Sequence, residues 1–267
     1  MRTLLVAFFS LFATFAVAQQ QVQPLDSCRA QIPWGAPPNT KADVTPICRI
    51  GYLALHDNQA KIPVWVSYVL TSDKAIGCYP RDDAFAPDHS LPKGRRAELS
   101  DYYKSGYDIG HVANNADMSW HPGVQRESFI LSNMYPQLPG LNRGIWKLLE
   151  TAARSWAWGR GTNLTIMTGA IYDINNTKKI GANGVVVPSG FWKIIVDNNT
   201  QESLAFIFPH QEGLGKDLSK VQVTVADVER VVGAPFSVPG NKNVKAPLWP
   251  TFSKAMADEK KKVCKGG

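Results

Sequence analysis

The sequence predicts one α+β domain, and three observations support this prediction. Short runs rich in β-branched and aromatic residues alternate with turn residues, one long amphipathic helix lies in the middle of the chain, and neither a repeat nor a linker divides it. Of the 267 residues, 44% are hydrophobic and 19% are charged, a balance typical of globular rather than disordered proteins. We therefore expect a single domain over residues 19–267.

The first 18 residues have the pattern of a secretory signal peptide. Arg2 supplies one early positive charge, an apolar run covers residues 3–17, and Ala16-Val17-Ala18 forms a small-x-small cleavage site. A membrane anchor is the alternative, but about 15 apolar residues are too few to span a bilayer comfortably. We expect cleavage after Ala18, a mature protein without membrane attachment, and a secreted or periplasmic location.

All four cysteines lie in the part of the chain that would be exported. In an oxidising compartment an even number of cysteines predicts disulfides, and four cysteines allow three pairings. Among these we expect Cys28–Cys48, which closes the N-terminal segment, and Cys78–Cys264, which ties the tail to the loop before the candidate site. No Cys-x-x-Cys pair is present, which argues against a zinc ribbon or a thioredoxin-type redox site.

Two strands are expected near the start of the mature chain. An irregular segment rich in Pro, Gln and Asn extends to residue 45, after which residues 49–55 form a strand, residues 56–60 a polar turn, and residues 62–70 (IPVWVSYVL) a second strand. Prolines then break residues 71–105 into a loop. Further strands are expected at residues 163–169, 185–187, 191–196 and 203–208.

Residues 141–159 form the clearest helix. Apolar side chains recur at i, i+3, i+4, i+7 and i+11 and make one stripe that can pack on a core: Ile145, Leu148, Leu149, Ala152 and Trp156. A shorter helix is expected over residues 226–232, where Gly233 ends it. The lysine-rich residues 258–267 are expected to form a charged tail.

The chain is basic. It carries 29 Lys and Arg against 22 Asp and Glu, a formal net charge of +7, which becomes +6 when Arg2 leaves with the signal peptide. A basic exported protein is attracted to polyanions, of which nucleic acid is the commonest. Charge alone does not identify a function, so the chemistry has to come from motifs.

His111 is the candidate general base. It ends the polar, Gly-rich run Ser-Gly-Tyr-Asp-Ile-Gly-His, where an imidazole can titrate near neutrality and activate water. A lone histidine is more often structural than catalytic, so this interpretation depends on the neighbouring residues.

Three polar residues along the predicted helix support it. In a regular helix, Glu150 lies about 80° and Arg154 about 120° around the axis from Asn142, and Glu150 is about 12 Å further along. An ion can then bind the amide oxygen of Asn142 directly and Glu150 through water, which suits Mg²⁺ because this cation retains its waters. The alternative is a solvated ion pair between Glu150 and Arg154.

Several motifs follow one another between residues 108 and 150. Asp108-Ile109-Gly110-His111 comes first, a polar stretch covers residues 113–118, Ser-Asn-x-x-Pro-Gln spans residues 132–137, and Leu141-Asn142, Trp146 and Leu149-Glu150 follow. This series resembles the DNA/RNA non-specific endonuclease family of ββα-metal nucleases, whose first motif is Asp-Arg-Gly-His. Looser similarity extends from the Cys28/Cys48 region to residues 191–193. The resemblance implies an α+β fold with a central, mainly antiparallel sheet and flanking helices.

The resemblance also implies an activity. Members of this family are sequence-nonspecific endonucleases that hydrolyse DNA and RNA with one Mg²⁺ ion, for which Mn²⁺ substitutes, and leave 5′-phosphate ends. His111 then corresponds to the general base, Asn142 to the one direct protein ligand of the metal, and Glu150 to the residue that holds the metal's waters. A supporting residue and two phosphate-binding arginines complete the expected site: Asn133, Arg154 and Arg81.

The chain departs from the family pattern at Ile109. An arginine at this position is expected to bind phosphate, and we expect Arg126 or Lys104 to substitute partly for it. The departure keeps two alternatives open: a catalytically weakened, nuclease-like nucleic-acid-binding module, and a phosphodiesterase for small nucleotides. The sequence leaves undetermined the preference between DNA and RNA, the oligomeric state, and whether an inhibitor protein exists as a partner.

Overall fold

The structure, a computed structural model, describes residues 24–175 and 177–264. The predicted signal peptide, residues 1–18, lies outside the described residues. A seven-stranded sheet with the order β1-β2-β3-β6-β9-β10-β11 forms the centre, and every neighbouring pair in it is antiparallel. Its strands are β1 (Val44–Cys48), β2 (Leu53–Asp57), β3 (Ile62–Leu70), β6 (Leu164–Ile171), β9 (Gly190–Asp197), β10 (Ser203–Pro209) and β11 (Gln222–Val223).

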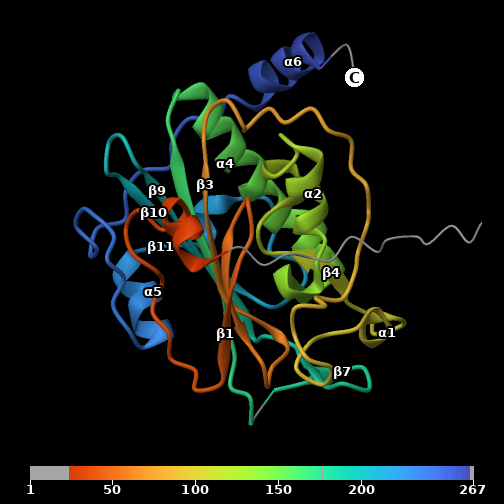
Figure 1. Cartoon of the computed structure of the whole chain (residues 1–267). Coiled ribbons are helices and arrows are strands. Elements are labelled where there is room, and N and C mark those ends of the chain that lie inside the picture. The colour runs from red at the N-terminus through yellow and green to blue at the C-terminus, as the bar shows by residue number, and fades with distance from the viewer. Residues whose placement is uncertain (1–23, 176, 265–267) are drawn as a thin grey trace, which may run out of the picture.

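Helices cover both faces of this sheet, which confirms the predicted α+β fold. Figure 1 shows α2 (Pro122–Ser128) and α4 (Lys147–Gly159) on one side and α5 (Val225–Val232) on the other. Each face has its own hydrophobic core: Leu149 and Trp156 of α4 belong to one, and Val228 of α5 to the other. Because both faces are covered, β9 is buried along its whole length and has no polar, solvent-facing side.

The central strands lie close to the predicted positions, whereas the N-terminal part differs. β3 matches its prediction, and β6, β9 and β10 each differ from theirs by a few residues. The segment expected to be irregular up to residue 45 contains a 3₁₀ helix, η1 (Leu25–Gln31), and the start of β1. The first strand was expected at residues 49–55, but β1 ends at Cys48 and β2 begins at Leu53. Within the described part of the chain, β1 pairs only with β2 and is therefore an edge strand of the sheet, a position that tolerates Pro46.

A second, two-stranded sheet carries the candidate base. β4 (Asp108–His111) pairs with β5 (Met134–Gln137) so that His111 lies opposite Met134. Short segments surround this pair: α1 (Leu99–Tyr102), the 3₁₀ turns η2 (Asn115–Asp117) and η3 (Leu131–Asn133), and α3 (Pro139–Leu141). Another short pair, β7 (Lys179–Ile180) and β8 (Val185–Val186), lies apart from it. The 3₁₀ turn η5 (Leu218–Lys220) precedes β11.

The predicted helix over residues 141–159 is not continuous. A π-helical turn, η4 (Asn142–Trp146), precedes α4, and Gly144 inside it has φ −98° and ψ −117°, outside the helical region. The angles computed for a regular helix therefore do not apply between Asn142 and Glu150. Pro139, Gly140 and Gly144 explain the irregularity, because one proline and two glycines interrupt the helical ladder.

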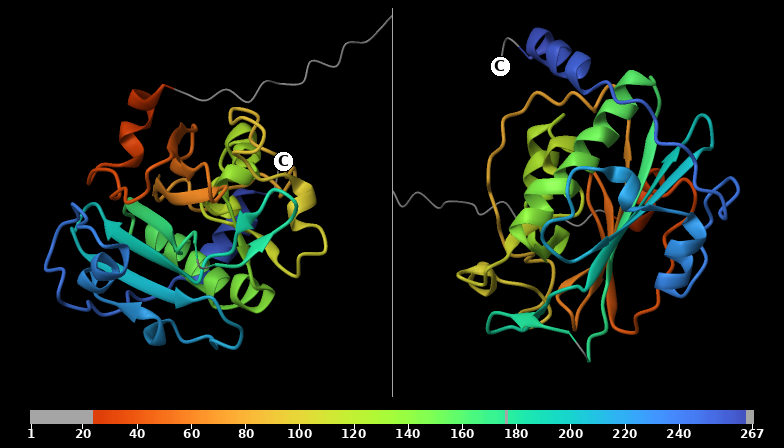
Figure 2. Two further views of the ribbon diagram at one scale, coloured as in Figure 1. Left: turned by 90° about the horizontal axis from the view of Figure 1, so that it is seen from below. Right: turned by 180° about the vertical axis from the view of Figure 1, so that it is seen from behind.

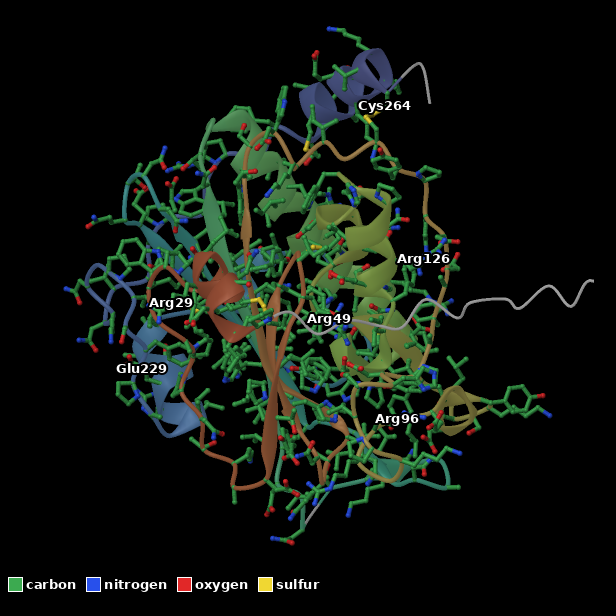
Figure 3. The ribbon with its side chains drawn as sticks, viewed as in Figure 1. Arg29, Arg49, Arg96, Arg126, Glu229 and Cys264 are labelled. Atoms are coloured by element: carbon green, nitrogen blue, oxygen red, sulfur yellow. A yellow bond between two sulfur atoms is a disulfide. The ribbon has the colours of Figure 1, made fainter. Side chains whose placement is uncertain are left out.

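The C-terminal tail is more ordered than expected. Residues 253–263 form helix α6 (Ser253–Val263), which packs against α4 at one end of the molecule (Figures 1 and 2). Both expected disulfides, Cys28–Cys48 and Cys78–Cys264, are present. Figure 3 shows Cys264 at the end of α6, next to the loop that follows β3. Among residues 24–175 and 177–264, no helix is long and apolar enough to cross a membrane.

Candidate active site

One cleft collects five of the six predicted site residues. Its volume is about 480 Å³, and its walls come from the loop at residues 78–81, the end of β4, η2, η4, α4 and α6. The predicted residues that line it are Arg81, His111, Asn142, Glu150 and Arg154. These positions are up to 73 residues apart in the chain (154 minus 81), so the fold, and not local sequence, brings them together.

His111 lies at the inner end of β4 in an aromatic pocket. Its ring centroid is 4.8 Å from that of Phe129 and 5.5 Å from that of Phe85, and only 8% of the residue is exposed. Burial, together with the positive charge of Arg81, lowers the pKa of His111 to about 3. The imidazole is therefore neutral at physiological pH. Its Nε2 is buried without a hydrogen-bond partner among the described residues, and the residue lines the cleft.

Steric crowding explains why position 110, in the Asp-x-Gly-His motif, is a glycine. Gly110 lies opposite Tyr135 in the β4–β5 pair, and a Cβ added to it would lie 1.9 Å from Oε1 of Gln137. The Gln137 side chain is fully buried, so it has little room to move away. A larger residue at position 110 would push β4 from β5 and displace His111.

Asn133 does not line the cleft but holds the chain that follows His111. Its Oδ1 accepts a hydrogen bond from the backbone N–H of Ala113 at 2.8 Å, and its Nδ2 donates to the carbonyls of Ala113 and Ser128 at 2.9 and 2.8 Å. Asn133 is completely buried. It is thus a positioning residue, and its contacts are to the backbone beside the candidate base.

Asn142 is oriented by Asp108, the first residue of the motif. Its Nδ2 donates to Oδ2 of Asp108 at 2.9 Å, which leaves Oδ1 without a donor among the described residues. Arg143 binds both oxygens of the same carboxylate, at 2.8 and 2.5 Å. Burial raises the pKa of Asp108, but the hydrogen bonds from Arg143 and Asn142 outweigh it and hold that pKa below its usual value. A permanent carboxylate therefore fixes Asn142 with its amide oxygen available as a ligand.

Glu150 is buried beside a lysine that the sequence analysis did not select. Only 6% of Glu150 and 1% of Lys193 are exposed. Burial raises the pKa of Glu150 to about 7, although the positive charge of Lys193 opposes the shift, and burial lowers the pKa of Lys193. Lys193 also lies 4.4 Å from the centre of the Trp146 ring. A lysine in the middle of the apolar run at residues 191–196 was the available signal, because lysine is rarely buried unless it is partnered.

Arg154 pairs with Asp117 and not with Glu150. Its Nη1 donates to Oδ1 of Asp117 at 2.8 Å and to Oδ1 of Asn114 at 3.1 Å. Asp117 is itself buried and accepts a hydrogen bond from Tyr68 at 2.6 Å. The alternative of a solvated Glu150–Arg154 ion pair is therefore wrong: Arg154 is held in a fixed orientation at the cleft wall.

Arg81 comes from the loop before β4 and is more exposed than Arg154. Its guanidinium carbon is 5.0 Å from the centre of the Phe129 ring, and its Nε donates to Asp83 at 2.7 Å. Since Phe129 also packs on His111, one aromatic ring positions both the candidate base and this cation.

The pocket that contains Ile109 holds neither of the two cations that we expected. Arg126 pairs with Asp82 and lines a neighbouring pocket, and Lys104 lies over the ring of Tyr103; neither lines the cleft. A small pocket of about 360 Å³ that adjoins the cleft contains Ile109 together with Arg81 and Arg143. We therefore expect Arg143, and not Arg126 or Lys104, to substitute for the missing arginine. Arg143 lies in the irregular turn η4.

The donors at this cleft fit a hard divalent cation. The free Oδ1 of Asn142 and the carboxylate of Glu150 are oxygen ligands, and Mg²⁺ prefers oxygen ligands and keeps several waters. Among the described residues no group of three or more His, Cys, Asp or Glu side chains is arranged to hold a metal. A cation here would therefore depend on few protein ligands and on water or phosphate oxygens for the others.

Comparison with known proteins agrees with this geometry. A model of the family "DNA/RNA non-specific endonuclease" matches residues 36–243. A nuclease from Nostoc is 30% identical over 254 residues, which are 86% of this chain and 90% of that protein. Mouse mitochondrial nuclease EXOG is 31% identical over 198 residues, which are 68% of this chain but just over half (54%) of that protein.

A solved structure shows the same fold. In a crystal structure of an EndoG/EndoGI complex, the matched chain has a TM-score of 0.69 and 28% identity, and the match covers 81% of this chain and 94% of that one. The family match covers well over half of the chain and includes every residue of the cleft described above except Lys260. The chain therefore belongs to the DNA/RNA non-specific endonuclease family.

Proposed function

We propose that this protein is a Mg²⁺-dependent, sequence-nonspecific endonuclease that hydrolyses phosphodiester bonds in DNA and RNA. The observation that carries the proposal is the neutral His111, whose buried Nε2 has no hydrogen-bond partner among the described residues and which shares one cleft with Asn142, Glu150 and several cations. Family membership supports the same activity.

His111 acts as the general base. Because its imidazole is neutral, Nε2 accepts a proton from a water molecule while the water oxygen attacks phosphorus. The bond from phosphorus to the 3′ oxygen breaks opposite the attacking oxygen, which leaves a 5′-phosphate and, after protonation, a 3′-hydroxyl. Asn133 keeps the base in place through its hydrogen bonds to Ala113.

Asn142 and Glu150 would hold the metal: Asn142 would bind it through Oδ1, and Glu150 would act through water. When bound, Mg²⁺ supplies positive charge that stabilises the leaving oxygen, and Mn²⁺ can take its place. Asp108 supports Asn142 by accepting its amide hydrogen bond, so the oxygen keeps its orientation when the substrate leaves.

Arginines from different segments of the cleft bind the phosphate. Arg154 stabilises the charge that develops on the phosphate oxygens, and its ion pair with Asp117 fixes its direction. Arg81 contacts the phosphate from the loop before β4, and Arg143 adds a cation beside Ile109.

The protein acts outside the cytoplasm in this proposal. We infer that residues 1–18 are a signal peptide, that residues 19–267 are one nuclease domain, and that the mature protein is secreted or periplasmic. The two disulfides support an oxidising compartment. An inhibitor protein is a further candidate partner, because the matched solved structure is described as an EndoG/EndoGI complex that shows a mechanism of EndoG inhibition.

Digestion of supercoiled plasmid and of RNA, with Mg²⁺ and with excess chelator, tests the function. The wild-type protein should nick both substrates, and chelator should abolish this. His111→Ala and Asn142→Ala should each lose about 10²–10⁴-fold in rate, since the first removes the proposed base and the second removes the proposed direct ligand of the metal. His121→Ala is the matched control, because His121 caps α2 and does not line the cleft.

Three results would contradict the assignment. Near-normal nicking by His111→Ala would show that another group is the base. Binding of DNA by the wild type without any cleavage would favour the nucleic-acid-binding module. Hydrolysis of small nucleotide diesters alone would favour the phosphodiesterase.

A further inference from the structure

Helix α6 lies beyond the residues that the family model matches, and it reaches the active-site cleft. The family match ends at residue 243, whereas α6 covers Ser253–Val263. Lys260 of this helix lines the cleft together with Arg154 and His111. A role for this helix in substrate binding rests on the proposed nuclease function.

The start of α6 is fixed on α4 by specific contacts. The carbonyl of Trp249 accepts a hydrogen bond from Nε1 of Trp156 at 3.0 Å, and the two rings pack edge to face with centroids 5.4 Å apart. The backbone N–H of Phe252 donates to Oγ of Ser155 at 3.2 Å. The Phe252 ring lies directly against Gly159, where a Cβ would come within 2.1 Å of it.

The end of α6 is fixed covalently. Cys264 directly follows the helix and forms a disulfide with Cys78, which itself lines the cleft. Between these two anchors, no residue of α6 is buried. Hydrophobic packing therefore does not explain why the chain holds this helix at the rim of the cleft.

The charges of α6 give a different reason. It carries four lysines and two acidic residues: Lys254, Lys260, Lys261, Lys262, Asp258 and Glu259. Lys261 and Lys262 pair with Asp258 and Glu259, whereas Lys260 has no carboxylate partner among the described residues. Lys260 and Arg154 line the same cleft, so two positive charges lie where an anion can bind; burial, and then the positive charge of Arg154, lower the pKa of Lys260.

We propose that α6 is a disulfide-anchored extension of the nucleic-acid-binding surface, on which Lys260 binds a backbone phosphate next to the one that is cleaved. The disulfide and the contacts of Trp249 and Phe252 hold the helix so that Lys260 faces the bound nucleic acid. The contact is to phosphate alone, so it adds affinity without sequence preference.

Binding of a labelled DNA duplex to the His111→Ala protein, measured by fluorescence anisotropy over a salt series in Mg²⁺, tests this. Adding Lys260→Ala should weaken binding several-fold and reduce the slope of log K against log salt by about 0.9, the value for one phosphate contact. Lys261→Ala is the matched control: it removes the same charge from the same helix, but Lys261 pairs with Asp258 and does not line the cleft.

The disulfide provides a second measurement. In a Cys78→Ala, Cys264→Ala background, Lys260→Ala should change the slope much less, because the released helix no longer holds the lysine in place. Circular dichroism checks that each variant is folded. Equal slopes for Lys260→Ala and Lys261→Ala, or tighter binding after Lys260→Ala, would overturn the inference without contradicting the proposed nuclease function. A wild-type protein that neither binds nor cuts nucleic acid would overturn the proposed function as well.

Discussion

Position 109 lacks the positive charge of the family motif, and Arg143 is the residue that we expect to supply it. Ile109 is half-buried and packs against the hydrophobic core. Its side chain carries no charge, so it cannot replace the arginine of the family motif. Arg143 lies in the same small pocket, bound to the aspartate two residues before the glycine of that motif, and 72% of its side chain is exposed. We therefore expect Arg143 to contact the phosphate that binds beside residue 109.

We expect Arg143→Ala to weaken substrate binding by about tenfold, because a charge-assisted hydrogen bond is lost. The salt dependence of binding should decrease by about one phosphate contact. Ile109→Arg in the wild type should have the opposite effect on both quantities, and in the Arg143→Ala protein it should restore affinity. Affinity and its salt dependence are measured on the same duplex for all four proteins. If Ile109→Arg leaves both unchanged, residue 109 does not face the phosphate.

At the level of elements, the β4–β5 pair positions the candidate base, His111. It is only four residues long on each side, so it depends on contacts beyond its own ladder. Asn133 supplies them from the end of η3, and Gly110 allows the close approach of Gln137. The site therefore consists of short segments that the large sheet and α4 hold together.

Asn133→Ala should lower the free energy of unfolding by about 3 kcal/mol, because it leaves buried backbone groups of Ala113 and Ser128 without partners, at about 1–3 kcal/mol each. The turnover number should fall as well, since His111 loses its support, while the Michaelis constant changes less. Urea unfolding and steady-state kinetics measure the two effects. Asn243→Ala, at an exposed position, is the control and should change stability by less than about 0.5 kcal/mol. An Asn133→Ala protein with normal stability would contradict this role.

The same scale shows where local sequence patterns stop being informative. The apolar stripe of α4 predicted that helix because it buries one face, and the β-branched and aromatic residues of β3 predicted that strand, which is buried along nearly its whole length. The strands of the β4–β5 pair and the π-helical turn at Asn142 have no such periodic signal. They are too short for a pattern to develop, and their conformation comes from pairing and packing with distant segments.

For the whole molecule, the two disulfides constrain very different lengths of chain. Cys78–Cys264 spans 186 residues and Cys28–Cys48 spans 20. Loop-closure entropy assigns about 5 kcal/mol to the longer loop and about 3 kcal/mol to the shorter one. The longer bridge also joins the helix outside the family match to the rim of the cleft, so it connects stability with the binding surface.

Removal of either bridge by paired alanine substitutions should lower the melting temperature, and Cys78→Ala, Cys264→Ala should lower it further than Cys28→Ala, Cys48→Ala. Differential scanning calorimetry under non-reducing conditions measures both. Wild-type protein treated with a reductant should approach the protein that lacks both bridges. If the short bridge has the larger effect, packing of the buried Cys28 and Cys48, and not loop closure, determines the outcome.

The sequence by itself determined the α+β class, the central strands, the helix that carries Glu150 and Arg154, the family and the six candidate residues. These follow from periodic patterns and from motifs that lie close together in the chain. The tertiary structure decided that Arg154 pairs with Asp117, that Lys193 lies buried beside Glu150, that Arg143 is the cation next to Ile109, and that Lys260 reaches the cleft. Each of these contacts joins segments whose approach depends on packing of the whole sheet and its helices, which no local pattern encodes.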